Sequence, residues 1–187
     1  MHNLNNDYIV HKMHNVDKQA VAGYPLSRYE APILVFGCGN TLMGDDGFGP
    51  AVIERLQTDH RLPASVWVED VGTSIRDILF DLLLAPKKPQ MILIIDAAQQ
   101  ERRLGGELFE LPVDEIASEK VNDFSVHHFP SLNLLKELAE LGNVEVRVLT
   151  VQVTNLPEEI QAGLSPAVAA AIPAACTWAL RLIGEAT

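Results

Sequence analysis

Residues 37–49 read Gly-Cys-Gly-Asn-Thr-Leu-Met-Gly-Asp-Asp-Gly-Phe-Gly, and this glycine-rich stretch decides the fold. It follows Ile33–Phe36, a continuous apolar run that is typical of a strand buried on both faces of a sheet. It precedes Pro50–Leu56, which reads as a helix with a proline in its first turn, where a missing N–H costs nothing. A turn between a buried strand and a helix is where doubly wound α/β folds place their ligand loops.

The succession of strands and helices continues to the end of the chain and predicts a doubly wound α/β sheet. Met91–Ile95 is the most apolar run and predicts the central strand, whereas Gly106–Leu111 predicts a short antiparallel edge strand. The other predicted strands are Ser65–Glu69 and Val144–Val153. The other predicted helices run from Thr73 or Ser74 to Leu84, from Ser131 to Leu141, and onward from Ser165.

Residues 1–30 differ from the rest of the chain. They are rich in Asn and His and show no sustained hydrophobic period. We therefore expect a flexible N-terminal extension over residues 1–30 and a single α/β domain over residues 31–187. The first residues also lack the basic and apolar regions of a secretory signal.

The formal net charge of −11 limits the partners that this chain can bind. A surplus of carboxylates disfavours nucleic acid and anionic membranes, because both are bound through lysine and arginine. No apolar stretch reaches the roughly 20 residues that span a bilayer. The two cysteines, Cys38 and Cys176, are too few for a disulfide framework. We therefore expect a cytoplasmic protein with neither nucleic acid nor membrane as a partner.

The glycine-rich stretch does not fit a nucleotide site. Its third glycine, Gly44, lies two residues beyond the G-x-G-x-x-G spacing, and no Lys-Ser/Thr pair follows. Asp45 and Asp46 lie at the helix entrance, where they would repel a pyrophosphate. Helix capping explains one aspartate, but two beside several glycines favour a metal site or a general acid–base site.

Further polar residues are predicted at the same edge of the sheet, because ligands bind beyond the carboxyl ends of parallel strands. Asp70 and Asp96 each follow a predicted strand, although Asp70 is equally well explained as a cap for the next helix. Asp96 ends an apolar strand and needs a partner or an ion to offset its desolvation. His127 precedes a helix, and two carboxylates with one imidazole suit nickel, zinc or manganese. Cys38 has no basic neighbour in sequence and is interpreted as a packed thiol.

Four segments together resemble the maturation endopeptidases of nickel–iron hydrogenases. They are residues 37–49, Asp70–Thr73, Ile95–Ala97 and Ser125–His127, and the resemblance extends from about Ile33 to Ile183. The stretch His-His-Phe-Pro-Ser-Leu at 127–132 is most similar to the branch that serves the deazaflavin-reducing hydrogenase of methanogens. The resemblance implies a three-layer α/β fold, in which helices flank both faces of a twisted, mostly parallel five-stranded sheet.

The resemblance also implies an activity, namely removal of a C-terminal extension from the hydrogenase large-subunit precursor after nickel insertion. It places the metal-contacting and catalytic positions on Asp46, Asp96 and His127, with His128 as the alternative histidine. Asp45 and Asp70 are lesser candidates, and Asn40 is expected to organise the loop. Nickel is expected to come from the substrate, with no organic cofactor. The family is grouped with aspartic-type peptidases, and the sequence leaves open whether a metal or a carboxylate activates the water.

Three other functions remain possible at this point. A non-catalytic assembly factor would dock on the large subunit without cleaving it. A nucleotide-binding module would be stabilised by a dinucleotide, and an independent metallohydrolase would carry its own stoichiometric metal.

Overall fold

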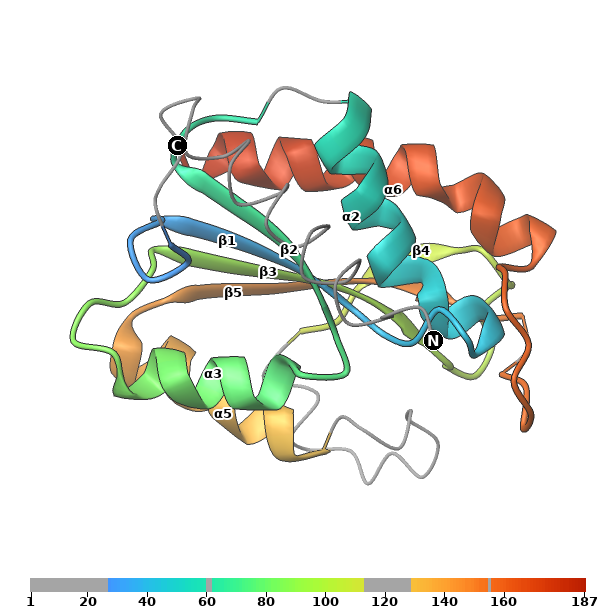
Figure 1. Cartoon of the computed structure of the whole chain (residues 1–187), viewed down its shortest axis with the longest axis horizontal. Coiled ribbons are helices and arrows are strands. Elements are labelled where there is room, and N and C mark those ends of the chain that lie inside the picture. Colours follow the sequence, from blue (N-terminus) through green and yellow to red (C-terminus); the bar gives the residue numbers. More distant parts are fainter. Residues whose placement is uncertain (1–26, 60–61, 113–128, 155) are drawn as a thin grey trace, which may run out of the picture.

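A five-stranded sheet lies at the centre of the computed structural model, which describes residues 27–59, 62–112, 129–154 and 156–187 (Figure 1). The strand order is β2-β1-β3-β5-β4, and only β4 is antiparallel to its neighbour. The strands are β1 (Ile33–Cys38), β2 (Val66–Gly72), β3 (Met91–Ala98), β4 (Leu108–Glu110) and β5 (Glu145–Gln152). The helices are the 3-10 helix η1 (Gly44–Gly47), α2 (Phe48–Asp59), α3 (Ile75–Leu84), α5 (Phe129–Gly142) and α6 (Pro166–Glu185).

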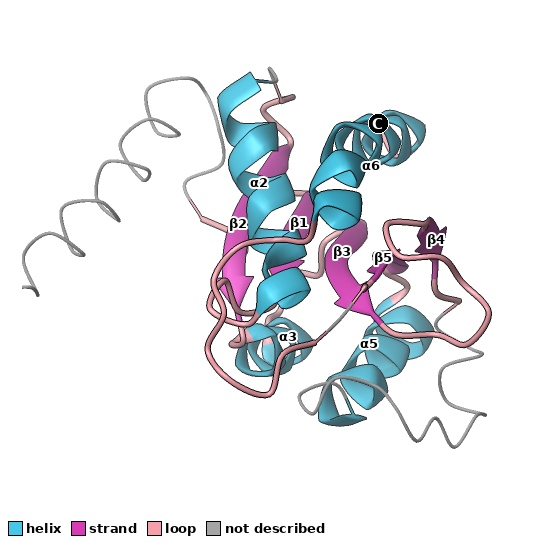
Figure 2. Ribbon diagram, turned by 90° about the vertical axis from the view of Figure 1, so that its right-hand side faces the viewer, coloured by secondary structure: helices cyan, strands magenta, loops and turns pink. Residues whose placement is uncertain are grey.

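Helices cover both faces of the sheet, so the predicted three-layer α/β architecture is confirmed (Figure 2). Helices α2 and α6 pack on one face, and α3 and α5 pack on the other. Because side chains alternate along a strand, Leu93 and Ile95 of β3 enter one core while Ile92 and Ile94 enter the other. Both faces are buried, which explains why this strand is apolar at nearly every position.

The order and type of the predicted strands and helices are confirmed, but several boundaries differ, three of them close to candidate site residues. Strands β2 and β3 continue past Glu69 and Ile95, so Asp70 and Asp96 lie inside strands and not after them. Hydrogen bonding to the neighbouring strand extends each strand beyond its apolar run, since Asp96 pairs in register with Thr150. Helix α5 begins at Phe129, two residues before Ser131, the predicted cap.

The sequence predicts no stretch long enough to span a bilayer, and helix α6 contradicts this expectation. Its 20 residues are long and apolar enough to do so by length and composition, and 39% of its most apolar window is buried. Length and composition alone are weak evidence for a membrane span, because core helices pass the same test. One face of α6 packs in the core with β5 and α2.

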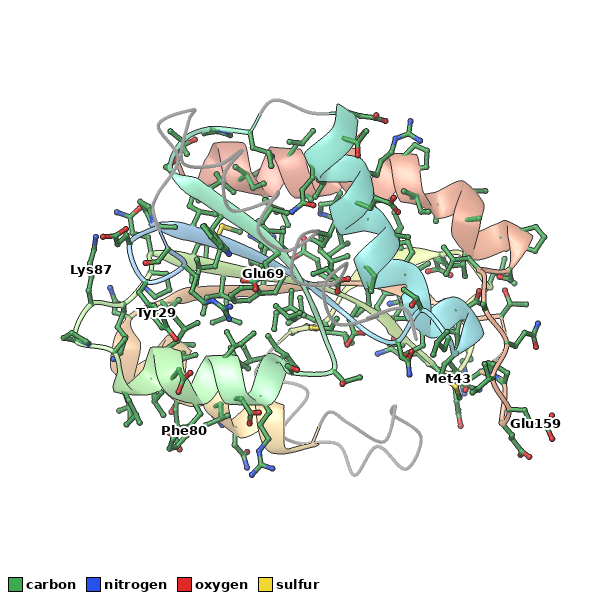
Figure 3. The ribbon with its side chains drawn as sticks, in the orientation of Figure 1. Tyr29, Met43, Glu69, Phe80, Lys87 and Glu159 are labelled. Atoms are coloured by element: carbon green, nitrogen blue, oxygen red, sulfur yellow. The ribbon has the colours of Figure 1, made fainter. Side chains whose placement is uncertain are left out.

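Residues 27–30 form a turn that contacts the domain. The Arg28 guanidinium lies 2.8 Å from the carboxylate of Glu69, and the Tyr29 hydroxyl donates to Asp81. Tyr29 lies at the amino end of the sheet, opposite Met43 and Glu159 (Figure 3). Residues 1–26 lie outside the described residues, so the flexible extension remains a prediction.

Helix α2 lies unusually close to the strands because glycines meet at the contact. A Cβ on Gly49 would come within 2.6 Å of the Cys38 nitrogen and even closer to the carbonyl oxygens of Cys38 and Ile95. A Cβ on Gly37 would lie 2.6 Å from the Gly49 carbonyl oxygen. Only glycine at both positions allows the first turn of α2 to rest on the ends of β1 and β3.

We predict that Gly49→Ala lowers the free energy of unfolding by at least about 2 kcal/mol, because the added methyl collides with backbone that cannot move aside. Gly184→Ala is the matched control, since nothing lies within 4 Å of a Cβ at that helical position. It should leave stability unchanged or raise it by up to about 1 kcal/mol. Urea unfolding followed by circular dichroism measures both, and equal stability of the two variants would contradict the packing argument.

Candidate active site

The carboxyl ends of β1 and β3 form the topological switch point of the sheet. The chain passes from β1 outward to β2 and then returns to β3 on the other side of β1. Connections therefore leave these two strands in opposite directions, which opens a crevice where α/β proteins bind ligands. The glycine-rich loop follows β1 at this point, and Asp96 lies near the end of β3.

Asp46 is held in the loop by backbone groups. One of its carboxylate oxygens accepts a hydrogen bond from the Asn40 backbone N–H at 2.7 Å, and Asp46 is 8% exposed. The Asn40 side chain accepts from the Leu42 N–H at 3.0 Å, so Asn40 organises the loop through both its backbone and its side chain. Gly39 has a φ of +124°, and a Cβ there would collide with the Asp46 carbonyl. The loop therefore closes tightly over the end of β1.

Asp96 is 3% exposed within β3. One carboxylate oxygen accepts from the backbone N–H of the next residue, Ala97, at 2.8 Å. Its neighbour across the ladder, Thr150, is also buried and donates its hydroxyl to the Phe109 carbonyl at 2.9 Å. Asp96 is therefore fixed by the strand itself at the crevice.

The negative charges of three carboxylates act on the Cys38 thiol. Its pKa is raised well above the usual value, first by burial and then by the negative charges of Asp96, Asp70 and Asp46. Carboxylates from β3, from β2 and from the loop therefore lie around Cys38, since Asp70 pairs in register with the adjacent Gly37, and we call these three residues the three-carboxylate cluster. Asp70 is its exposed member, with one oxygen accepting from the Gly72 N–H at 2.9 Å. The surrounding negative charge keeps the thiol protonated.

Asp45 faces a different part of the molecule. Its carboxylate accepts from the backbone N–H groups of Thr154 and Ser165 at 2.9 and 2.6 Å, and from the Ser165 hydroxyl at 3.0 Å. Ser165 is the N-cap of α6, so Asp45 fastens the loop to that helix. Asp45 is a lesser site candidate from the sequence, whereas in the structure its hydrogen bonds give it a supporting role. Its partners lie 109 and 120 residues away, and no local pattern indicates them.

His127 and His128 lie outside the described residues. Among the residues that the structure does describe, no three His, Cys, Asp or Glu side chains form a group that could hold a metal ion. Asp46 and Asp96 are thus placed at the crevice, while the histidine contact remains a prediction.

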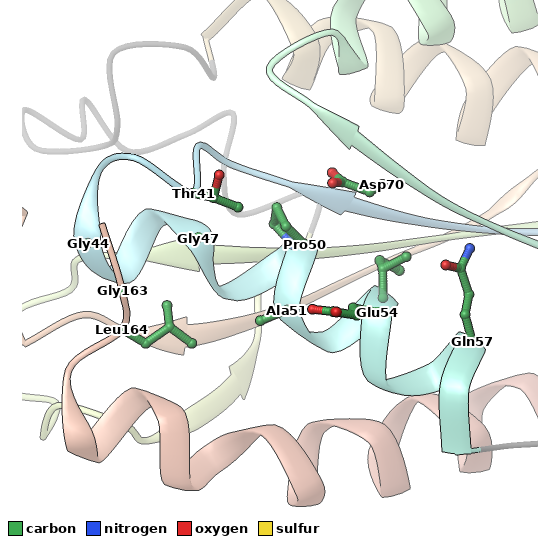
Figure 4. Close-up of a pocket in the computed structure, with 11 residues that line it drawn as sticks. Thr41, Gly44, Gly47, Pro50, Ala51, Glu54, Gln57, Asp70, Gly163 and Leu164 are labelled. Carbon is green, nitrogen blue, oxygen red and sulfur yellow. The ribbon is translucent and has the colours of Figure 1, made fainter. Parts of the chain in front are cut away.

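A pocket of about 440 Å³ lies beside the three-carboxylate cluster (Figure 4). We call it the α2 groove. Its lining residues come from the loop, α2, the end of β2 and the segment before α6: Thr41, Gly44, Gly47, Pro50, Ala51, Ile53, Glu54, Gln57, Asp70, Gly163 and Leu164. The sequence gives no sign of this pocket, because Glu54 and Gln57 have the pattern of an ordinary solvent-exposed helix face.

We predict that Asp45→Asn lowers the free energy of unfolding by about 2 kcal/mol, because an amide group would turn N–H donors toward the Thr154 or Ser165 donors. Glu159→Gln, an equivalent change at an exposed residue, should stay within about 0.5 kcal/mol of wild type. Thermal and urea unfolding provide the comparison, and a stable Asp45→Asn protein would remove Asp45 from this supporting role.

We also predict that neither cysteine of the native protein reacts with an aromatic disulfide reagent at pH 8. Cys38 and Cys176 are buried, and burial raises the pKa of each thiol. Both should react after denaturation, giving two thiols per chain. Rapid labelling of native Cys38 would show that the crevice is open to the thiol.

Comparison with known proteins agrees with this architecture. A family model described as hydrogenase maturation protease matches residues 50–182. The coenzyme F420 hydrogenase subunit delta of Methanothermobacter thermautotrophicus is 34% identical over 83% of this chain and 97% of its own length. The hydrogenase 2 maturation protease of Escherichia coli is 28% identical over 82% of this chain and 91% of its own length.

Solved structures give the same result. The hydrogenase maturating endopeptidase HybD of Escherichia coli superposes with a TM-score of 0.65, covering 82% of this chain and 92% of its own at 28% identity. The nickel–iron hydrogenase maturation protease HybD of Thermococcus kodakarensis gives a TM-score of 0.60, covering 81% and 98% at 25% identity. Sequence and structure agree over the same domain, and the chain therefore belongs to the hydrogenase maturation protease family and is a peptidase.

Proposed function

We propose that this protein removes the C-terminal extension of a nickel–iron hydrogenase large-subunit precursor after nickel insertion, and that it recognises the bound nickel. The observation that carries the proposal is the three-carboxylate cluster at the switch point, in which Asp46 of the loop and Asp96 of β3 are buried and Asp70 of β2 is exposed. Their negative charge would attract a divalent cation that the substrate brings to the crevice.

Nickel acts in this proposal as part of the substrate. Asp46, Asp96 and His127 would supply two oxygens and one nitrogen, a donor set that suits nickel. Such a set leaves coordination positions for cysteine thiolates of the precursor, so the precursor would present the metal and the protease would complete its coordination. Empty precursor would lack the cation that the carboxylates attract, and cleavage would depend on loading.

Hydrolysis then requires a water molecule, a base and a leaving group. One carboxylate of the site takes a proton from the water, whose oxygen forms a bond to the scissile carbonyl carbon. The C–N bond breaks, and the amide nitrogen of the extension leaves after gaining one proton. Asp96 is our candidate for the base, in keeping with the aspartic-type grouping that the resemblance implies.

The similarity to the coenzyme F420 hydrogenase subunit delta supports the precursor of that hydrogenase as the substrate. The two buried, unbridged cysteines support a cytoplasmic location, where thiols remain reduced. No organic cofactor enters the proposed reaction.

The test is incubation with nickel-loaded and nickel-free large-subunit precursor, followed by mass spectrometry of the products. We expect loss of a C-terminal peptide from the loaded precursor alone. Asp96→Asn should slow this cleavage at least about 100-fold, because it removes the base. Asp77→Asn, an exposed residue on α3, is the matched control and should cleave at the wild-type rate.

Other outcomes would overturn the proposal. Equal cleavage of both precursors would show that the protein does not recognise nickel. Full activity of Asp96→Asn would show that Asp96 is not the catalytic base. A stable complex with loaded precursor that never releases a peptide would identify a non-catalytic assembly factor instead.

A further inference from the structure

The α2 groove contains neither Asp46 nor Asp96 and has no role in the proposed hydrolysis. It runs along one side of α2, from the loop residues Gly44 and Gly47 at one end to Gln57 at the other (Figure 4). The Gln57 side chain donates to the Val68 carbonyl of β2 at 2.9 Å, which fixes the far end of the groove against the edge strand. Asp70 belongs both to the lining and to the three-carboxylate cluster, so the groove leads away from the crevice.

The dimensions of the groove match a short peptide. Pro50, Ala51, Glu54 and Gln57 lie on one face of α2, and the rise from Pro50 to Gln57 is about 10 Å. An extended chain covers that length with about three residues, at about 3.3 Å for each. Backbone contact is possible at the loop end because glycines line it.

The charge of the groove identifies the side chains that it favours. Glu54 and Asp70 are the charged residues of the lining, and both are exposed. Within the part of the chain that the structure describes, neither forms an ion pair with a lysine or an arginine. A bound segment with a basic side chain would supply the missing charge, whereas an acidic segment would be repelled.

We infer that the α2 groove binds the C-terminal extension of the precursor as an extended segment of about three residues, with a basic side chain facing Glu54 and Asp70. The inference rests on the proposed function, since it names the part of the precursor beyond the scissile bond. The nickel-bearing side of that bond lies at Asp46 and Asp96, and the groove is the continuation of the crevice from Asp70. In this arrangement the extension determines the affinity and register with which the precursor binds, and the bound nickel is required for cleavage.

Photo-crosslinking tests where the extension lies without depending on cleavage. The full chain carries p-benzoylphenylalanine at Gln57, together with Asp96→Asn, and is mixed with nickel-loaded coenzyme F420 hydrogenase large-subunit precursor. We expect crosslinks to the extension, within a few residues of the scissile bond. The same probe at Phe80, an exposed position on α3, should give none. Crosslinks from Gln57 to the mature part of the precursor alone, or an absence of crosslinks, would overturn the inference.

Charge reversal tests the basic side chain. Glu54→Lys should raise the KM for the precursor about fivefold to tenfold with little change in kcat, because the lost attraction is partly exposed to solvent. Replacing the basic residues of the extension by glutamate should restore the KM of this variant. Glu30→Lys, at the opposite end of the sheet, changes the net charge equally and should keep the wild-type KM.

The two proposals fail in different ways. Wild-type protein that cleaves loaded precursor, with an unchanged KM for Glu54→Lys, overturns the groove inference and leaves the proposed function standing. Wild-type protein that cleaves no precursor overturns the proposed function itself.

Discussion

The contact between the first turn of α2 and the ends of β1 and β3 is the constraint on which the site depends. Gly37 and Gly49 bring the helix backbone against the strand backbone, and no other residue type fits there. The loop between them must then turn back sharply, which Gly39 and Gly44 allow through their positive φ angles. Asp46 is carried by this turn to the switch point of the sheet. These glycines are therefore required to place the Asp46 carboxylate at the switch point.

Burial of like charges needs compensation, and the fold supplies part of it. Asp46 lies in η1, two residues before the start of α2, whose N-terminal end attracts negative charge. Backbone N–H groups donate to both Asp46 and Asp96. These donors orient the two carboxylates. The overall charge of −11 is thus less informative than its local arrangement, since a few of the 25 acidic residues create the site.

The sequence predicted most of the architecture because hydrophobic period and turn residues report local structure. It indicated Asp46 and Asp96 as site residues, and both lie at the crevice. The ends of β2 and β3 were predicted too early. Hydropathy alone makes a charged residue look like the end of a strand, whereas hydrogen bonding to the neighbouring strand sets the true boundary. The supporting role of Asp45 could not be predicted, since its partners come from distant residues. The α2 groove was hidden for a related reason: a pocket needs walls from several segments, and a helix alone shows only a polar face.

The link from Asp45 to Ser165 also affects how the protein is made. A ribosome adds residues from the N-terminus, and the loop is complete long before the start of α6 emerges. Ser165 follows Asp45 by 120 positions, and all of this chain must be synthesised before the carboxylate meets its backbone donor. Until then the glycine-rich loop lacks one of its anchors, and the crevice cannot take its final shape. The crevice of this peptidase is therefore among the last parts of the nascent chain to take its final shape.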